Sequence, residues 1–137
     1  MNGRNENIKL GNLTPTRDFN YVKDICHGFE LALKAKNIFG ETINLGSGYE
    51  ISIKDVAFLI SSLMESKINI KKNVERMRPN KSEVNRLCAS NKKAKRLLKW
   101  KPQFFGKQGL KKALIETIEW YQRNQIFKKD NSDSYVI

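Results

Sequence analysis

Apolar residues recur at three- and four-residue intervals in several stretches of this chain, and this periodicity limits the possible folds more than any other feature. In residues 22–36 the apolar positions are Val22, Ile25, Phe29 and Leu33. Such spacing places the four side chains along one stripe of a helix, so we predict an amphipathic helix here. Helices of this kind need other surfaces against which their apolar stripes can pack.

Three further helices are predicted. Ser52 opens one of them, because its hydroxyl can accept a hydrogen bond from the backbone of Asp55 and so cap the helix. The other two are expected over residues 90–99, with Ser90 as the cap, and over residues 109–123.

Short strands are expected between the helices. The candidates are residues 8–10, 17–21, 42–45 and 68–74, whereas residues 76–86 are polar and irregular. These strands are too short and too widely separated to form a full doubly wound sheet. The predicted fold class is therefore α/β, in the form of a helix-rich α+β arrangement.

The chain has 137 residues, which is enough for one compact domain, and its charge is strongly basic. It contains 26 Lys and Arg against 14 Asp and Glu, for a net charge of +12. Residues 67–112 hold sixteen basic residues and two acidic ones, Glu75 and Glu83. The excess predicts attraction to nucleic acid, a phosphorylated metabolite or acidic lipid. A lysine-rich solvated surface explains it equally well.

The two cysteines, Cys26 and Cys88, have no paired CxxC spacing. Cys26 falls on the apolar side of the first predicted helix, so we expect a buried free thiol, which suits a reducing cytoplasm. No stretch approaches the roughly 18 consecutive apolar residues of a membrane span. Residues 1–10 lack the apolar core of a signal peptide. We therefore expect a cytoplasmic protein without membrane contact.

Residues able to carry catalysis are not evident. The turn Gly46-Ser47-Gly48 follows a predicted strand, but it lacks the third glycine that a dinucleotide-binding loop needs, so we interpret it as a plain tight turn. His27 is the single histidine, and metal sites usually need several ligands at matched spacing. We predict no catalytic residue, no cofactor-binding residue and no metal ligand in this chain.

Two arginines in loops are candidates for binding an anion. Arg17 lies where a loop meets a predicted strand, and Arg78 precedes Pro79 in a polar loop. Arginine suits phosphate because its planar guanidinium donates two parallel hydrogen bonds. A local salt bridge between Arg17 and Asp18 or Asp24 is an equally weighted alternative.

Five segments in order resemble the extended short-chain dehydrogenases that act on nucleotide sugars. They are residues 10–24 (GNL…TRDFxYVxD), 44–48 (NLGSG), 78–84 (RPxxSEV), 94–102 (A…LxWxP) and 109–120 (GL…TIEW). Together they cover about residues 9–124. The likeness is greatest to UDP-N-acetylglucosamine 4,6-dehydratases, with GDP-mannose and dTDP-glucose 4,6-dehydratases as near relatives.

The resemblance implies roles for four residues. Arg17 and Arg78 match the arginines that hold the diphosphate of the substrate. Glu83 matches an acidic residue near the nucleotide ribose, and Asn12 lies in the stretch that folds over the nucleotide.

The resemblance also implies that this is the C-terminal, substrate-binding portion of such an enzyme, without its Rossmann half. That half would bind NAD and carry the Tyr-x-x-x-Lys pair, so we expect the chain not to be catalytic alone. NAD belongs to the complete enzyme, and a separately encoded Rossmann half is a candidate partner. Apolar stripes that would pack on the absent half should be exposed. Residues 1–8 are expected to fray, 9–124 to form the nucleotide-sugar-binding domain, and 125–137 to form a polar tail.

Three positions depart from the family pattern. Lys99 stands where the family has glycine, at the end of a helix. Ser90 replaces the usual aspartate but can still cap, and Gly106 stands where a Ser or Thr cap is common.

The function predicted is nucleotide-sugar binding within an NAD-dependent 4,6-dehydratase or epimerase of bacterial surface-polysaccharide synthesis, with a UDP-sugar favoured. One alternative is a basic nucleic-acid-binding module driven by counterion release; against it, the chain offers no paired stacking aromatics and no zinc finger. Another is a non-functional remnant or an interaction partner.

Overall fold

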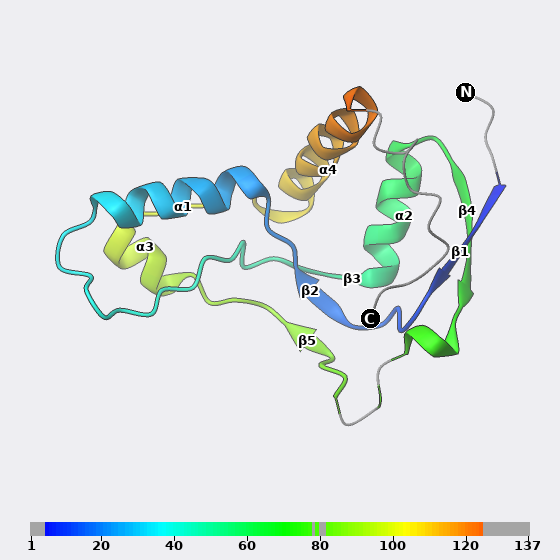
Figure 1. Ribbon diagram of the computed structural model, residues 1–137, viewed down its shortest axis with the longest axis horizontal. Helices are drawn as coiled ribbons and strands as arrows, with labels where there is room; N and C mark the ends of the chain where they lie inside the picture. The colour runs from blue at the N-terminus through cyan, green and yellow to red at the C-terminus, as the bar shows by residue number, and fades with distance from the viewer. Residues whose placement is uncertain (1–4, 78, 80–81, 125–137) are drawn as a thin grey trace.

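The computed structural model describes residues 5–77, 79 and 82–124, which form helices and two small sheets (Figure 1). The helices are α1 (Val22–Lys34), α2 (Ile53–Leu63), α3 (Lys92–Leu98) and α4 (Gly106–Arg123), with a 3-10 turn, η1, at Val74–Arg76. The strands are β1 (Asn5–Leu10), β2 (Thr16–Asp18), β3 (Glu50–Ser52), β4 (Lys67–Lys72) and β5 (Arg86–Leu87). Within this described part, every helix is too short or too polar to span a lipid bilayer.

The two sheets are small and differ in strand direction. β1 pairs in parallel with β4, with Ile8 opposite Ile70. In the other sheet the order is β3-β2-β5, with β2 antiparallel to β3 and parallel to β5. In Figure 1, α2 stands beside the β1–β4 pair, α1 and α3 lie together at the opposite end, and the three-stranded sheet lies between them. The prediction of a helix-rich α/β fold is confirmed.

The most deeply buried side chains lie between α1 and α3. Trp100 is fully buried there beside Ala94 and Leu98. Its indole Nε1 donates a hydrogen bond to the backbone oxygen of Asp24, at 3.0 Å. Partly buried apolar residues surround this cluster: Leu31, Ala32, Ala35, Ile38, Ile43 and Leu45. Trp100 therefore fixes the end of α3 against α1, with its polar N–H satisfied.

The inner side of α1 includes Gly28, Leu31 and Ala32, none of which belongs to the predicted stripe. Gly28 is buried and faces Leu45, and a Cβ at position 28 would meet Leu45 Cδ1 at 2.4 Å. A larger residue at position 28 would force the Leu45 side chain to shift, so glycine favours this close approach of the helix to the chain beyond it.

Three of the four residues of the predicted stripe face outward, whereas the fourth, Ile25, is partly buried. Val22, Phe29 and Leu33 are 62%, 63% and 88% exposed. The expectation of exposed apolar patches is confirmed, but the prediction that Cys26 is a buried thiol is wrong, because this cysteine shares the exposed face. Periodicity shows which residues share a side of a helix, but it does not show which side meets the core.

Asp24 ties the first turn of α1 to the segment between α3 and α4. Its side chain is buried, and the carboxylate accepts hydrogen bonds from the backbone N–H groups of Gln103, at 2.8 Å, and Phe104, at 3.0 Å. A buried charge is tolerated when it is hydrogen-bonded in this way, and the N-terminus of a helix favours a negative group.

Several strands differ from those predicted. β1 begins at Asn5, within the segment 1–8 that is expected to fray. The predicted strand at residues 42–45 is wrong, because these residues form no ladder in the structure and Ile43 and Leu45 pack on the Trp100 cluster instead. Conversely, β5 forms at the end of the stretch 76–86 that is predicted to be irregular. The expected tail, 125–137, lies outside the described residues.

The two predicted serine caps have different outcomes. Ser52 caps α2 as expected: its Oγ accepts from the backbone N of Asp55 at 3.0 Å and donates to the Asp55 carboxylate at 2.6 Å. The prediction for Ser90 is wrong, because Asn91 occupies the N-cap position of α3. The Asn91 amide does not cap the helix but donates to the carbonyl of Gly46, at 2.8 Å.

Lys99 offers a test of the helix end. It terminates α3 in the left-handed conformation, with φ 55° and ψ 18°, where a side chain with a Cβ is strained and glycine is not. We expect Lys99→Gly to raise the free energy of unfolding by about 1 kcal/mol in urea titrations. The control is Lys101→Gly, at an exposed lysine in the next segment, which should not stabilise the chain. An equal gain from both variants would contradict the backbone explanation.

Candidate functional site

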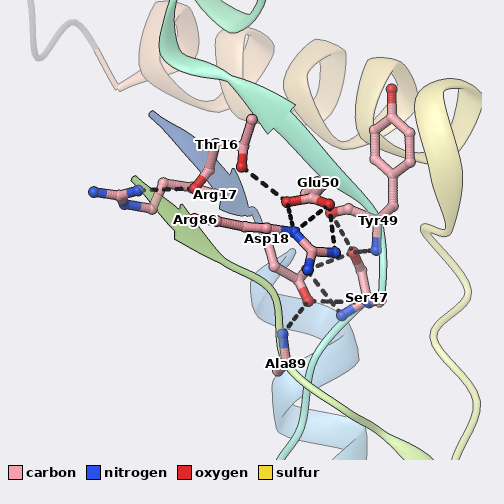
Figure 2. Close-up of polar contacts among 9 residues, drawn as sticks. Thr16, Arg17, Asp18, Ser47, Tyr49, Glu50, Arg86 and Ala89 are labelled. Atoms are coloured by element: carbon pink, nitrogen blue, oxygen red, sulfur yellow. Dashed lines mark hydrogen bonds and ion pairs between the residues drawn. The ribbon is translucent and has the colours of Figure 1, made fainter. Parts of the chain in front are cut away.

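The predicted phosphate ligand Arg17 lies in the middle of β2. Because successive side chains of a strand point to opposite faces, Arg17 lies on one face of the sheet and Thr16 and Asp18 lie on the other. Figure 2 shows the Arg17 side chain pointing away from the polar cluster around Glu50. Each face of β2 therefore has its own set of contacts.

Arg17 and Glu83, distant in sequence, meet in the structure. Arg17 Nη2 lies 3.4 Å from Glu83 Oε1, and Arg17 Nη1 donates to the carbonyl of Thr16 at 2.8 Å. The two side chains are 23% and 14% exposed. The structure pairs Arg17 with Glu83 rather than with Asp18 or Asp24, whose carboxylates accept backbone N–H groups.

Of the other two predicted site residues, the structure describes Asn12, whose side chain makes its contacts elsewhere. Asn12 Oδ1 accepts hydrogen bonds from the backbone N and the Oγ1 of Thr14, at 3.2 and 3.0 Å, and so shapes the loop between β1 and β2. Arg78 lies outside the described residues. The structure therefore brings Arg17 and Glu83 together, and the roles of all four residues at a nucleotide stay predictions.

Asp18 organises the other face of β2 (Figure 2). Its carboxylate accepts hydrogen bonds from Ser47 N at 3.0 Å, Ser47 Oγ at 2.5 Å, Gly48 N at 3.0 Å and Ala89 N at 3.2 Å. These donors come from the turn before β3 and from the segment after β5. One carboxylate therefore fixes two loops against β2.

This contact decides whether Gly46-Ser47-Gly48 could hold a dinucleotide. A pyrophosphate needs free backbone N–H groups, and those of Ser47 and Gly48 already bind the Asp18 carboxylate, whose charge would repel a phosphate. The space beside Gly46 is also filled, since a Cβ there would meet the Cβ of Ala89 at 2.3 Å. The turn does not fit the pyrophosphate of NAD.

Sequence reasoning missed a polar cluster that joins the three strands of this sheet. Arg86 Nε donates to Glu50 Oε1 at 2.7 Å, and Thr16 Oγ1 donates to Glu50 Oε2 at 2.8 Å. The Arg86 guanidinium first, and then the Thr16 hydroxyl, lower the pKa of Glu50 below its usual value. Local sequence carries no signal for this contact, because it depends on the register of three short strands that are distant in the chain.

The fold and the site together define a class: the substrate-binding part of an extended short-chain dehydrogenase. A family model described as GDP-mannose 4,6 dehydratase matches residues 1–113. The chain belongs to this family of NAD-dependent nucleotide-sugar epimerases and dehydratases.

Individual relatives agree with this assignment. The UDP-glucuronate 4-epimerase of Thermodesulfobacterium geofontis is 35% identical over 119 residues, which are 85% of this chain and 34% of that protein. The solved structure of the epimerase Mth375 from Methanothermobacter thermautotrophicus is 30% identical, with a TM-score of 0.74 over 93% of this chain and 36% of that one. A UDP-glucuronic acid 4-epimerase from Bacillus cereus, solved with a UDP-sugar analogue and NAD, is 29% identical, with a TM-score of 0.68 over 88% of this chain and 36% of that one.

The chain therefore spans about a third of the length of the relatives it matches. In the B. cereus structure NAD and the UDP-sugar analogue occur with a complete enzyme. The activity of such an enzyme does not transfer to this chain by likeness alone.

The lowered pKa of Glu50 gives a prediction about pH. A carboxyl whose folded pKa is depressed adds stability above its unfolded pKa and loses it as the pH falls through the folded pKa. We expect Glu50→Gln to lower the thermal unfolding midpoint at pH 7, and the difference from the wild type to shrink as the pH falls below about 4.5. Glu65→Gln, at an exposed residue after α2, controls for loss of a negative charge. A difference that stays constant down to pH 3 would contradict the role of the Glu50–Arg86 pair.

Proposed function

We propose that this chain is the nucleotide-sugar-binding portion of an NAD-dependent 4,6-dehydratase or epimerase, with a UDP-sugar as the favoured ligand. The observation that carries the proposal is the meeting of Arg17 with Glu83 on one face of β2, at residues that match the family motifs. A guanidinium and a carboxylate side by side suit the two ends of a nucleoside diphosphate, since the first donates to phosphate and the second accepts from ribose hydroxyls.

The way in which the Arg17 side chain is held beside Glu83 supports the proposal. The Arg17 guanidinium is held by the Thr16 carbonyl at 2.8 Å and is only loosely engaged with Glu83, at 3.4 Å. It therefore keeps donors for a ligand while its position is restrained, which lowers the entropy lost on binding. In the proposed clamp Arg78 supplies the second guanidinium, and Asn12 lies in the loop that borders the nucleotide.

In this proposal the chain does not turn over substrate by itself. The turn at residues 46–48 follows a predicted strand, as a dinucleotide-binding loop would, but its N–H groups bind Asp18. Redox chemistry would therefore come from NAD held by a Rossmann-type part. We place the complete enzyme in the synthesis of bacterial surface polysaccharides and, because Cys26 and Cys88 are free thiols, in the cytoplasm.

Arg17→Ala tests the clamp. Loss of a charge-assisted hydrogen bond costs about 1.5–3 kcal/mol, so we expect the affinity for UDP-glucuronic acid, measured by titration calorimetry, to fall about 10- to 100-fold. The matched control is Arg123→Ala at the end of α4, where the arginine pairs with Glu119 on the surface and the change of charge is the same.

Two results would contradict the proposal. Equal weakening by both variants would mean that net charge, and not the Arg17 site, attracts the ligand. Salt-sensitive binding of random DNA duplex by a chain that does not respond to UDP-sugars would favour the nucleic-acid alternative.

A further inference from the structure

Basic residues cover the outer face of α3. The inner face of this helix packs through Ala94 and Leu98, which are buried beside Trp100. At about 100° per residue, the basic residues on the opposite side of the helix fall within an arc of roughly 100°, and a further exposed lysine ends the helix. We call this set the basic face; it consists of Lys92, Lys95, Arg96 and Lys99.

The chain itself does not neutralise the charge at this end of the molecule. Residues 30–42 and 90–101 contain eight basic residues and two glutamates. Each glutamate is paired with a lysine outside the basic face: Glu30 with Lys34 and Glu41 with Lys93. Within the described part of the chain the basic face takes part in no ion pair, so its positive charge is available to an anionic partner.

An exposed phenylalanine lies in the loop after α1. Ile38 packs on the buried cluster between α1 and α3, whereas the next residue, Phe39, is 94% exposed. The backbone N of Glu41 donates to the carbonyl of Ile38 at 3.1 Å, and Gly40 has a positive φ of 75°. These four residues therefore form a tight turn that holds Phe39 at its tip, out in the solvent.

This turn is fastened to the side of α3. Glu41 forms its ion pair with Lys93, and the Lys93 ammonium first, then the more distant Arg96 guanidinium, lower the pKa of Glu41. In Figure 1 the segment that follows α1 curves around α3, at the end of the molecule opposite the β1–β4 pair. Phe39 and the basic face therefore belong to the same end of the molecule.

An exposed apolar side chain beside several basic residues suits the surface of a membrane. Clusters of about four to eight Lys or Arg attract anionic lipid headgroups, and an aromatic side chain is stabilised at the boundary between headgroups and acyl chains. A nucleic-acid single strand would use the same charges, but it needs several aromatic side chains on which successive bases stack. Phe39 is the one exposed aromatic residue of segments 30–42 and 90–101.

We propose that the basic face of α3 and Phe39 together form a surface that binds anionic phospholipid headgroups, with the Phe39 ring entering the interface. Charge complementarity identifies this partner. The expectation of no membrane contact rests on the lack of an apolar span and of a signal peptide, neither of which a peripheral surface needs. The surface is separate from the nucleotide-sugar site, since Arg17 lies on β2.

Vesicle sedimentation tests the contribution of charge. We expect the 137-residue chain to bind vesicles of three parts phosphatidylcholine to one part phosphatidylglycerol more than about tenfold tighter than vesicles of phosphatidylcholine alone. A triple variant of the basic face should bind the mixed vesicles about 100-fold more weakly, because each basic residue near an anionic surface contributes roughly a fivefold gain. Its substitutions are Lys92→Gln, Lys95→Gln and Arg96→Gln.

The matched control removes the same charge from the other end of the molecule. It replaces three exposed lysines of β4: Lys67→Gln, Lys71→Gln and Lys72→Gln. Because exposed charges farther than about 10 Å from the lipid are largely screened, this variant should bind nearly as well as the wild type. Equal weakening by the two triple variants would mean that net charge attracts the vesicles, and would overturn the proposal.

Phe39 distinguishes a membrane from other polyanions. Phe39→Trp places an indole at the tip of the turn, and we expect its fluorescence to shift to the blue and to be quenched by lipids brominated on their acyl chains. Phe105→Trp, at a 60% exposed position beside α4, should show no change beyond that of the wild type, whose signal comes from Trp100 and Trp120. Bound vesicles that leave Phe39→Trp unquenched would place the contact elsewhere and overturn the proposal.

Nucleic acid is the competing partner. Binding of random duplex DNA that is tighter than binding of the mixed vesicles at the same salt concentration, and that the triple variant of α3 abolishes, would assign the basic face to nucleic acid and overturn the proposal. The replaced side chains are exposed, so the thermal unfolding midpoint of each variant should stay within about 2 °C of the wild type. A large fall for the α3 variant would show that these residues stabilise the fold rather than face a partner, which would also contradict the proposal.

Discussion

The candidate site depends on the carboxylate of Asp18. It accepts hydrogen bonds from Ser47 and Gly48, in the turn before β3, and from Ala89, in the segment after β5. Hydrogen bonds to a charged group are each worth about 1.5–3 kcal/mol, which is large for contacts between loops. β5 directly follows the loop that carries Glu83, so the approach of Glu83 to Arg17 depends on where β5 lies. The Asp18 carboxylate fixes β5 through its hydrogen bond to Ala89. The same hydrogen bonds occupy the N–H groups of the turn at residues 46–48, so this turn is not available to bind a phosphate.

The eight residues 17–24 make contacts that join several elements of the fold. Asp24 fastens α1 to the α3–α4 connection. Tyr21 donates its hydroxyl to Glu116 of α4 at 2.9 Å, and burial followed by this hydrogen bond raises the pKa of the tyrosine. Lys23 reaches the same carboxylate at 2.6 Å. The segment therefore positions β2 relative to α4, the α3–α4 connection and the loop before β3.

Features set by sequence neighbours were predictable, and features set by distant contacts were not. The helices follow from the periodicity of apolar residues. The cap follows from the position of the Ser52 hydroxyl, three residues before the backbone N–H from which it accepts a hydrogen bond. The exposure of Cys26 and the absence of a strand at residues 42–45 depend on what those residues pack against, which periodicity does not contain. Arg17 was identified from its chemistry and Glu83 from the family resemblance, but their contact required the fold of the segments between them.

In the described part of the chain, the hydrogen bonds of Asp18 and Asp24 position loops alongside a small apolar core. Trp100 is the one large side chain in this part that is fully buried, whereas Phe29 and Leu33 remain open to solvent. The bonds made by Asp18 and Asp24 are directional, so they fix where the loops lie as well as keeping them together. Apolar burial is non-directional and can be completed by any complementary surface. A chain built in this way holds β2, the strand that carries Arg17, in place through its own polar contacts.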